Sequence, residues 1–210
     1  MALKTFVKIG GINNLSDARY CAGMIVDILG FSFEPQDPNF MGPDKYTAIA
    51  EWISGVAFAA EFDESEPEQI REILQQYPQV DYLQITRPEF LPSLNLLQVP
   101  IILKIDLESQ EVASLEQLLE NTAPDVTYFL LENSEENPDP QALEKVLKLA
   151  GKYPILLGFG LSQENVLETI ENHPLKGIAL KGGDEIKPGY KDFDDLADIL
   201  ETIEVDDLEE

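Results

Sequence analysis

Short apolar runs recur along this chain at nearly regular intervals, and polar, helix-like stretches separate them. Most of the runs are apolar at consecutive positions rather than at alternate ones, which is typical of strands buried on both faces of a parallel sheet. The eight predicted strands are Phe6–Ile9, Ile28–Phe33, Val56–Phe62, Tyr82–Ile85, Ile101–Ile105, Thr127–Leu131, Ile155–Phe159 and Ile178–Leu180.

The segments between these runs favour helices. Asn14 offers a cap before an amphipathic stretch, and Pro43 and Pro67 suit the first turn of a helix. The segment 88–97 carries two prolines, so any helix there is expected to be brief. Apolar residues at three- and four-residue spacing predict helices over Ser114–Leu119, Pro140–Leu149, Ser162–Ile170 and Phe193–Ile203.

Alternating strands and helices over 210 residues leave about 26 residues for each unit, so the predicted fold is α/β, a single (β/α)8 TIM barrel near the small end of the usual size range. An open doubly wound sheet is the alternative, because strand order cannot be read from a sequence. No linker divides the chain, and we expect one domain over residues 1–205 followed by an acidic tail over 206–210.

The charge balance excludes several classes of partner. The chain has 40 acidic and 14 basic residues and a formal net charge of -26, so neither nucleic acid nor an anionic membrane surface is an expected partner. One cysteine, Cys21, excludes an internal disulfide and multi-cysteine metal sites, and we expect no metal or cofactor. The beginning of the sequence lacks the pattern of a signal peptide and no apolar run is long enough to span a membrane, so a cytoplasmic protein is expected.

The loops after the last two predicted strands carry the clearest signal of a ligand site. Gly158 and Gly160 stand at the end of one strand, and Gly182 and Gly183 follow the next, where backbone amides can approach an anion closely. In a barrel of this kind a phosphate commonly binds there. A group of lysines lies nearby in the sequence: Lys176, Lys181, Lys187 and Lys191. The alternative is that the glycines serve turns and caps while the lysines are ordinary surface residues.

The sequence resembles phosphoribosylanthranilate isomerase, a family of the tryptophan pathway. The opening segment 7–18, VKIGGINNLSDA, is similar to the family motif KICGI and the D-A pair that follows it. LGFSF at 29–33, GFGL at 158–161 and PGYKD at 188–192 match later segments of the family in order and spacing. The resemblance covers essentially the whole chain and implies a (β/α)8 barrel. It also implies an Amadori rearrangement, in which an acid and a base act on opposite sides of an aminoaldose phosphate.

The residues that the resemblance implies for this chemistry are only partly present. The family's catalytic base, the cysteine of KICGI, corresponds to Gly10, and its acid corresponds to Glu132. The arginine that holds the substrate carboxylate corresponds to Asn39, with Asp37 beside it. The family's QLHG segment keeps only its glutamine, Gln84. Acidic segments at 61–66 and 132–139 would further oppose anions on one side of the barrel mouth.

The sequence therefore predicts a divergent family member that binds a small phosphorylated sugar and whose isomerase activity is weak or lost. One alternative is an isomerase of another phosphosugar that uses Glu132 and Asp106, and another is a non-catalytic scaffold or regulatory barrel. A monomer or a homodimer is expected. The candidate catalytic residues are Glu132 and Asp106, and the candidate ligand-binding residues are Lys8, Gly158, Gly160, Lys181, Gly182 and Gly183.

Overall fold

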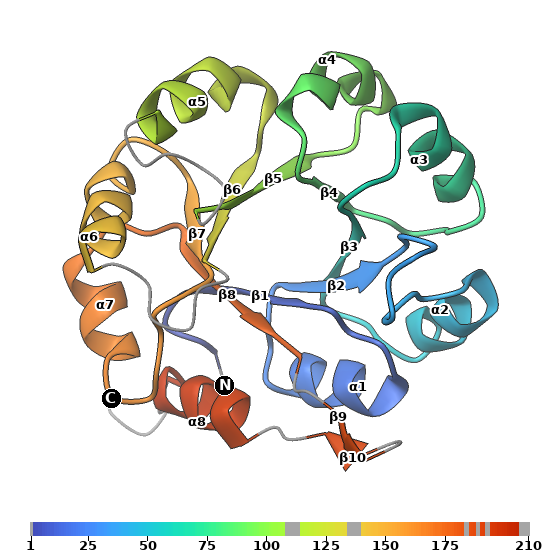
Figure 1. Ribbon diagram of the computed structural model, residues 1–210. Helices are drawn as coiled ribbons and strands as arrows, with labels where there is room; N and C mark the ends of the chain where they lie inside the picture. The colour runs from blue at the N-terminus through green and yellow to red at the C-terminus, as the bar shows by residue number, and fades with distance from the viewer. Residues whose placement is uncertain are drawn as a thin grey trace.

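The parallel strands of the chain close into a barrel, seen along its axis in Figure 1. The computed structural model describes residues 2–107, 114–133, 140–182, 185–187, 190–191 and 194–205. Neighbouring strands pair in sequence order, and β8 pairs with β1. The strands are β1 Phe6–Gly10, β2 Ile28–Ser32, β3 Ala57–Phe62, β4 Tyr82–Ile85, β5 Ile101–Asp106, β6 Tyr128–Glu132, β7 Ile155–Leu157 and β8 Gly177–Lys181. This closure confirms the predicted barrel, and the open sheet was wrong.

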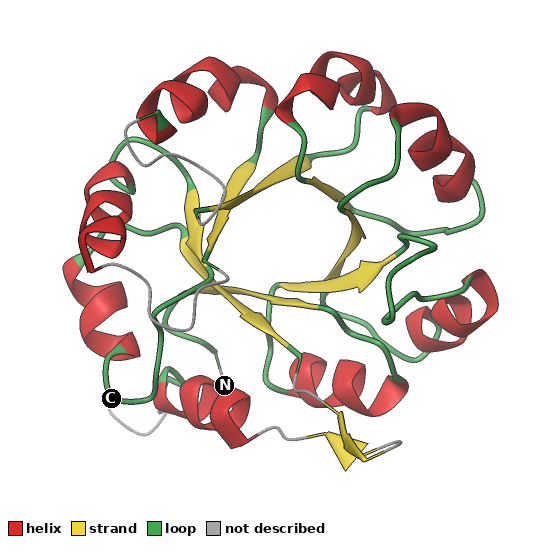
Figure 2. Cartoon of the chain, in the orientation of Figure 1, coloured by secondary structure: helices red, strands yellow, loops and turns green. Residues whose placement is uncertain are grey.

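Helices form an outer ring around the strands (Figure 2). Within the described part of the chain, three short 3-10 helices accompany them: η1 Pro88–Phe90, η2 Asn95–Leu97 and η3 Ala123–Asp125. The brief helix predicted over 88–97 is confirmed, because only four residues of that segment are α-helical. The α-helices are α1 Leu15–Gly23, α2 Pro43–Ala50, α3 Pro67–Leu74, α4 Leu91–Leu94, α5 Leu115–Thr122, α6 Pro140–Leu149, α7 Val166–Asn172 and α8 Asp194–Thr202.

Local capping explains where several helices begin. The side chain of Asn14 accepts a hydrogen bond from the amide of Asp17 at 2.9 Å, so it satisfies one of the free amides at the start of α1. Proline opens both α2 and α3, where its missing N–H costs nothing. The predicted cap and first-turn prolines are thus confirmed.

One element lies outside the barrel plan. A short antiparallel hairpin of β9 Glu185–Lys187 and β10 Tyr190–Lys191 stands between β8 and α8 and lies outside the ring of strands near α1 in Figure 1. No sequence pattern predicted it, because the segments are two and three residues long and show no alternation over a usable length.

The two ends of the described chain lie side by side (Figure 1). Leu3 and Glu204 form an antiparallel bridge, and the amide of Val205 donates to the carbonyl of Ala2 at 2.8 Å. The chain thus ties its last described residues to its first.

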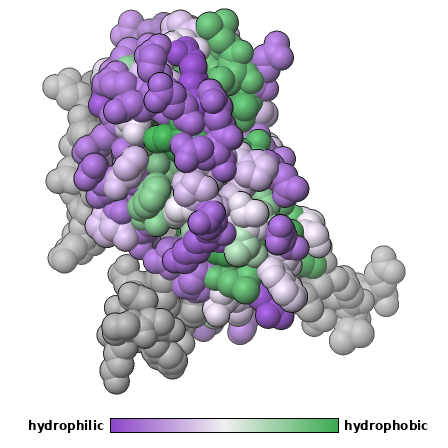
Figure 3. Space-filling model, turned by 90° about the vertical axis from the view of Figure 1, so that its right-hand side faces the viewer, coloured by the Kyte–Doolittle hydropathy of each residue, from purple (hydrophilic) through white to green (hydrophobic). Residues whose placement is uncertain are grey.

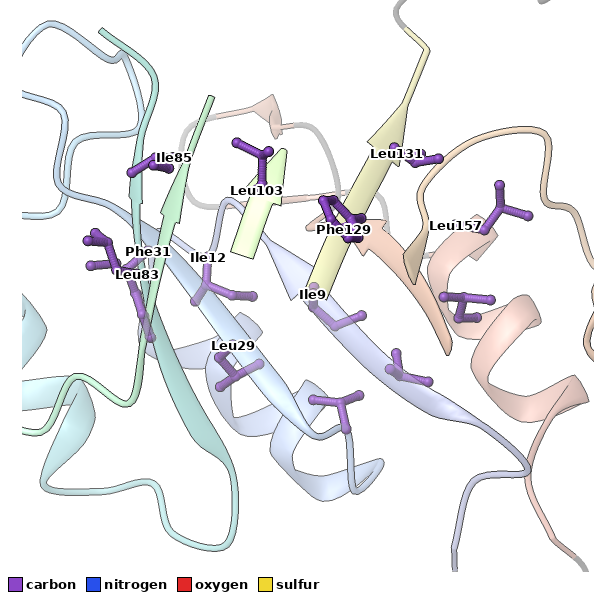
Figure 4. Packing of buried hydrophobic residues seen from close by; sticks show 14 of the residues in the cluster. Ile9, Ile12, Leu29, Phe31, Leu83, Ile85, Leu103, Phe129, Leu131 and Leu157 are labelled. Atoms are coloured by element: carbon purple, nitrogen blue, oxygen red, sulfur yellow. The ribbon is translucent and has the colours of Figure 1, made fainter. Parts of the chain in front are cut away.

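The hydrophobic core has two layers, because side chains on a strand point alternately to its two faces. One set faces the helices and includes Ile9, Leu29, Leu83, Phe129 and Leu157, which stand on separate strands in Figure 4. The other set fills the barrel interior and is much smaller: Ile28, Ala59, Ile102, Leu130, Leu156 and Ala179.

Among the described residues, five large hydrophobic side chains are exposed: Ile25, Phe40, Trp52, Leu96 and Val205. On the face shown in Figure 3, hydrophobic residues form small separate patches among hydrophilic ones. Within the described residues, no helix has the length and apolar character to cross a membrane, and no group of His, Cys, Asp and Glu side chains is arranged to hold a metal ion.

Candidate functional site

A layer of charged and polar side chains closes the barrel interior above its apolar filling. Residues two positions apart on a strand point to the same face, and on several strands an inward-facing apolar residue is followed two positions later by a polar one. Ala59 is followed by Glu61, Ile102 by Lys104, Leu130 by Glu132 and Ala179 by Lys181. These polar residues stand at the carboxyl ends of the strands and line a cavity of about 300 Å³. A cavity of this size can hold a small polar molecule.

The floor of the cavity is a buried ion pair between Lys8 of β1 and Glu61 of β3. The ammonium group of Lys8 contacts Oε1 of Glu61, and the two side chains are only 1% and 13% exposed. The amide of Gly11 donates to the other carboxylate oxygen at 3.1 Å. Both oxygens of Glu61 therefore have a fixed donor, and the carboxylate has a defined orientation.

Two glycines make room for this carboxylate. A Cβ atom at Gly30 would lie 2.0 Å from Oε1 of Glu61, and one at Gly10 would lie 3.0 Å from the same oxygen. Real Cβ atoms essentially never come closer than 3.0 Å, so Gly30 is required by this position of Glu61. At Gly10 the contact would be tight, and the carboxylate of Glu61 would have to shift slightly to admit a side chain.

A second ion pair lies at the rim, between Lys104 of β5 and Asp63, 2.6 Å apart. Burial alone would lower the pKa of Lys104, but the carboxylates of Asp63, Glu132 and Glu61 outweigh it and raise the pKa. Lys104 consequently stays protonated and contributes a fixed positive charge to this side of the mouth.

Glu132, at the end of β6, pairs with Lys181 at the end of β8. Their charged atoms are 3.1 Å apart, and the side chains are 16% and 71% exposed respectively. Because Lys181 is largely in solvent, this contact is weaker than a buried pair and easily exchanged. The missing side chain of Gly158 leaves room for Glu132, since a Cβ at Gly158 would lie 3.0 Å from Cγ of Glu132.

Among the described residues that line the cavity, Gln84 of β4 is the one with a buried polar atom that lacks a hydrogen-bond partner. It is 3% exposed, and its Oε1 has no hydrogen-bond partner. A buried amide oxygen without a donor costs free energy, and a bound molecule can supply the donor. The cavity therefore offers a free acceptor next to its carboxylates.

The wall after β2 is polar and carries no cation among its described residues. The side-chain oxygen of Asn39 accepts a hydrogen bond from Nδ2 of Asn13 at 2.8 Å, and the backbone amide of Asn39 donates to the carboxylate of Asp37 at 2.7 Å. All three side chains line the cavity. This wall suits hydroxyl and amine groups better than a carboxylate.

The structure brings together part of the predicted site. Lys8, Glu132, Lys181 and Gly182 line one cavity, together with Gly10 and Asn39. Asp106 pairs in register with Glu132 but lines a neighbouring depression of about 560 Å³ beside α5.

The predicted phosphate end is differently arranged. Gly158 and Gly160 do not line the cavity, and the amide of Gly158 already donates to the carbonyl of Leu131 at 2.8 Å. The amide of Gly182 donates to the carbonyl of Gly10 at 2.9 Å. Gly160, with φ of 67°, turns the chain after β7. Gly183, the acidic segment 134–139 and the tail 206–210 lie outside the described residues.

Sequence reasoning missed the central residue of the site, Glu61, which it grouped with an acidic loop. A signal was present: Glu61 is a charged residue inside the apolar run 56–62, two positions after Ala59. A charge at such a position on a buried strand requires a partner, and Lys8 on β1 holds the corresponding position.

Comparison with known proteins agrees with this architecture. Residues 7–202 match the family model described as N-(5'phosphoribosyl)anthranilate (PRA) isomerase. The chain belongs to this family. An N-(5'-phosphoribosyl)anthranilate isomerase of Maridesulfovibrio salexigens is 26% identical over 204 residues, which cover 93% of this chain and 96% of that protein.

Solved structures of the family share the fold. Phosphoribosyl anthranilate isomerase of Thermotoga maritima superposes with a TM-score of 0.76 at 22% identity, over 95% of this chain and 98% of that one. A phosphoribosyl anthranilate isomerase in complex with reduced 1-(o-carboxyphenylamino)-1-deoxyribulose 5-phosphate gives a TM-score of 0.74 at 22% identity, with the same coverage. The Thermotoga protein is described as dimeric.

Proposed function

We propose that this protein is a divergent member of the phosphoribosylanthranilate isomerase family that binds a small phosphorylated sugar in the barrel mouth and converts the anthranilate substrate weakly or not at all. The observation that carries the proposal is that Gly10 has no side chain, while the carboxylate of Glu61, from another strand, lies 3.0 Å from where a Cβ of Gly10 would stand. The mouth keeps Glu132 and a cavity, but its proton-transfer groups are rearranged.

Sugar binding is supported by the hydrogen-bond acceptors that line the cavity. The free oxygen of Gln84 and the carboxylates of Glu61 and Glu132 can accept bonds from sugar hydroxyls. A related isomerase binds a deoxyribulose 5-phosphate derivative, which is a ligand of this class.

Lys181 is the proposed contact for the phosphate. It is largely exposed, and its contact with Glu132 can be exchanged for a phosphate with little cost. The exchange would also release Glu132 to face the ligand. Gly160 and the loop after β7 are proposed to complete the phosphate end, with Gly183 beyond Gly182.

Weak conversion of the anthranilate substrate is supported by the wall after β2. Asn39 stands where the family resemblance expects an arginine for the substrate carboxylate, and Asp37 lines the cavity beside it. A carboxylate placed against Asp37 would meet a like charge, so both binding and orientation would suffer.

The anthranilate-fluorescence assay tests this proposal. Purified protein and the Maridesulfovibrio relative are assayed side by side on N-(5'-phosphoribosyl)anthranilate. We expect kcat/KM to be at least about 1000-fold lower for this protein, the order of effect that loss of a positioned acid or base produces. A value within about tenfold of the relative would contradict the proposal.

A second candidate function is the isomerisation of another phosphosugar. It is favoured by Glu61 and Glu132, which reach the same cavity from β3 and β6 on different sides of the barrel. Asp106, the partner first considered for Glu132, lines the adjacent depression and is a weaker candidate for this role.

A further inference from the structure

The most constrained carboxylate of the barrel mouth is Glu61, and neither the family match nor the motifs of the sequence assign it a role. Its side chain is 13% exposed, and it faces the cavity rather than the helices. Two groups fix it, the ammonium of Lys8 and the amide of Gly11, and the missing side chain of Gly30 leaves the space that it occupies. A carboxylate fixed in this way is oriented before any ligand arrives.

A ligand is needed to complete this part of the site. The Oε1 atom of Gln84, which is buried and without a hydrogen-bond partner, lies on the same cavity wall region as Glu61, since β4 pairs with β3 and Gln84 is in register with Glu61. A structural ion pair alone would leave no reason for an unsatisfied acceptor beside it. A polyhydroxylated molecule would supply the missing donor.

Glu132 faces the same cavity from β6 under different conditions. Its partner Lys181 is exposed and exchangeable, whereas the partner of Glu61 is buried and fixed. One carboxylate is thus held in place by a buried cation, whereas the contact of the other can be exchanged for a contact with a ligand. Two carboxylates in unequal surroundings are the arrangement that acid–base catalysis requires.

We propose that Glu61 is the catalytic base of this site, acting with Glu132 as the acid on aldose phosphates that carry no second anionic group. The inference rests on the proposed function, because it requires a phosphosugar in the mouth. It extends that function by naming the proton acceptor and the substrate class. The absence of a second anion follows from Asp37 and Asn39 on the neighbouring wall.

The reaction is an internal transfer of hydrogen from C2 to C1 of the open-chain aldose. Glu61 takes the proton from C2, the C–H electron pair forms the C1–C2 double bond, and Glu132 gives its proton to the C1 oxygen. In the resulting enediol, the protonated Glu61 returns a proton to C1 while Glu132 takes the proton of the C2 hydroxyl. The product is the ketose, and no external oxidant or reductant takes part.

The test uses D-ribose 5-phosphate as the probe in two separate measurements. Calorimetric titration measures its binding, and NMR in D₂O measures deuterium incorporation at C1 of the ketose and C2 of the aldose. We expect Glu61→Gln to bind the probe within about threefold of the unaltered protein and to exchange deuterium at least about 100-fold more slowly. Glu66→Gln, at an exposed carboxylate in the loop that follows β3 and outside the cavity lining, is the control and should leave both values unchanged.

The Glu61→Gln substitution leaves the buried Lys8 without its ion-pair partner, so this variant can fold poorly. Two further variants keep the test decisive in that case. Lys8→Met with Glu61→Gln removes both charges and should fold but not exchange. Glu61→Asp keeps the charge and withdraws the carboxylate by one methylene, and should reduce exchange about tenfold or more.

The outcomes separate this inference from the proposed function. Binding with exchange that disappears in the Glu61 variants supports it. Binding without any exchange in the unaltered protein, or exchange that persists in Glu61→Gln, overturns the role of Glu61 and leaves the proposed function standing. No binding of the probe overturns both.

Discussion

At the scale of single residues, the site depends on which positions lack a side chain. Gly30 and Gly10 leave the space that the Glu61 carboxylate fills, while Gly177 lets β8 approach β1. The two kinds of close approach differ physically. At Gly30 an added Cβ meets the end of a side chain, whereas at Gly177 it would lie 2.1 Å from the backbone oxygen of Phe6.

This difference gives a prediction for alanine substitutions. Gly30→Ala should lower the free energy of unfolding by about 1–3 kcal/mol through overpacking. In a Glu61→Ala background the same substitution should cost less, because the closest clashing atoms are gone and only Nζ of Lys8, 2.9 Å from the added Cβ, remains. Gly177→Ala should be equally harmful in both backgrounds. Urea unfolding of the four variants checks this, with Gly23→Ala, where a Cβ meets nothing within 4 Å, as the control. Equal costs for Gly30→Ala in both backgrounds would refute the packing explanation.

Some residues of the site could be predicted from the sequence, and others could not. Glu132 and Lys181 were predictable, because both stand at strand ends in recognisable positions. Glu61 was not recognised, because its partner Lys8 is 53 residues away and only the closed barrel brings them together. Hydrogen bonding of the Gly158 and Gly182 amides likewise depends on strand register, which sequence patterns do not fix.

At the scale of elements, a buried carboxylate connects the loops that follow β2 and β3. Glu34 accepts from the amides of Glu64 and Ser65 at 3.0 and 2.9 Å and from the Ser65 hydroxyl at 2.8 Å. Burial would raise the pKa of Glu34, but these donors outweigh it and lower the pKa. The loops on this side of the mouth are therefore held by an ionised group.

A pH dependence follows from this arrangement. Since the folded-state pKa of Glu34 lies below its ordinary value of 4.5, its stabilising effect is complete above that pH and is lost as the pH falls through the lowered pKa. Glu34→Gln should cost about 1.5–3 kcal/mol at pH 7 and much less at pH 3. Urea unfolding at both pH values measures the difference, with Glu68→Gln, an exposed carboxylate, as control. A cost that does not change with pH would contradict this assignment.

The elements themselves were largely readable from the sequence. All eight predicted strands are present, with ends that differ by one or two residues, and α6 has the predicted bounds. The segment predicted as a helix from Ser162 becomes helical only at Val166, because Asn165 and Ser162 first form a turn in which the Ser162 amide donates to Oδ1 of Asn165 at 2.9 Å. Such local competition between side chain and backbone is invisible to hydrophobic periodicity.

At the scale of the whole molecule, barrel closure extends to the chain ends. Ile203 is fully buried, and its carbonyl accepts from the amide of Lys4 at 2.9 Å. We therefore propose that the domain ends near residue 205, as the sequence predicted.

Truncation tests this boundary. Removal of residues 206–210 should change the free energy of unfolding by less than about 0.5 kcal/mol, the usual range for surface changes. Removal of 203–210 should cost about 2–5 kcal/mol, because it deletes the buried Ile203 side chain and the bonds to the N-terminal segment. Chemical denaturation of the two truncated proteins gives both values, and equal stability of the two would place the boundary earlier.

The net charge of -26 predicts a dependence on salt. Repulsion among 40 acidic residues opposes the compact state, and the screening length falls from about 30 Å at 0.01 M to about 3 Å at 1 M. The thermal midpoint should rise by about 2–8 °C between 10 and 500 mM NaCl, equivalent to about 1–2 kcal/mol. Calorimetry with sucrose in place of salt controls for excluded-solute effects. A midpoint that does not rise would show that the acidic surface does not limit stability.

We propose that the barrel mouth has exchanged the anthranilate chemistry of its family for a differently placed pair of carboxylates. The most direct measurement is the turnover of N-(5'-phosphoribosyl)anthranilate, followed by anthranilate fluorescence, beside the relative from Maridesulfovibrio salexigens. We expect kcat/KM at least about 1000-fold below that of the relative. Comparable turnover by the two proteins would contradict the claim.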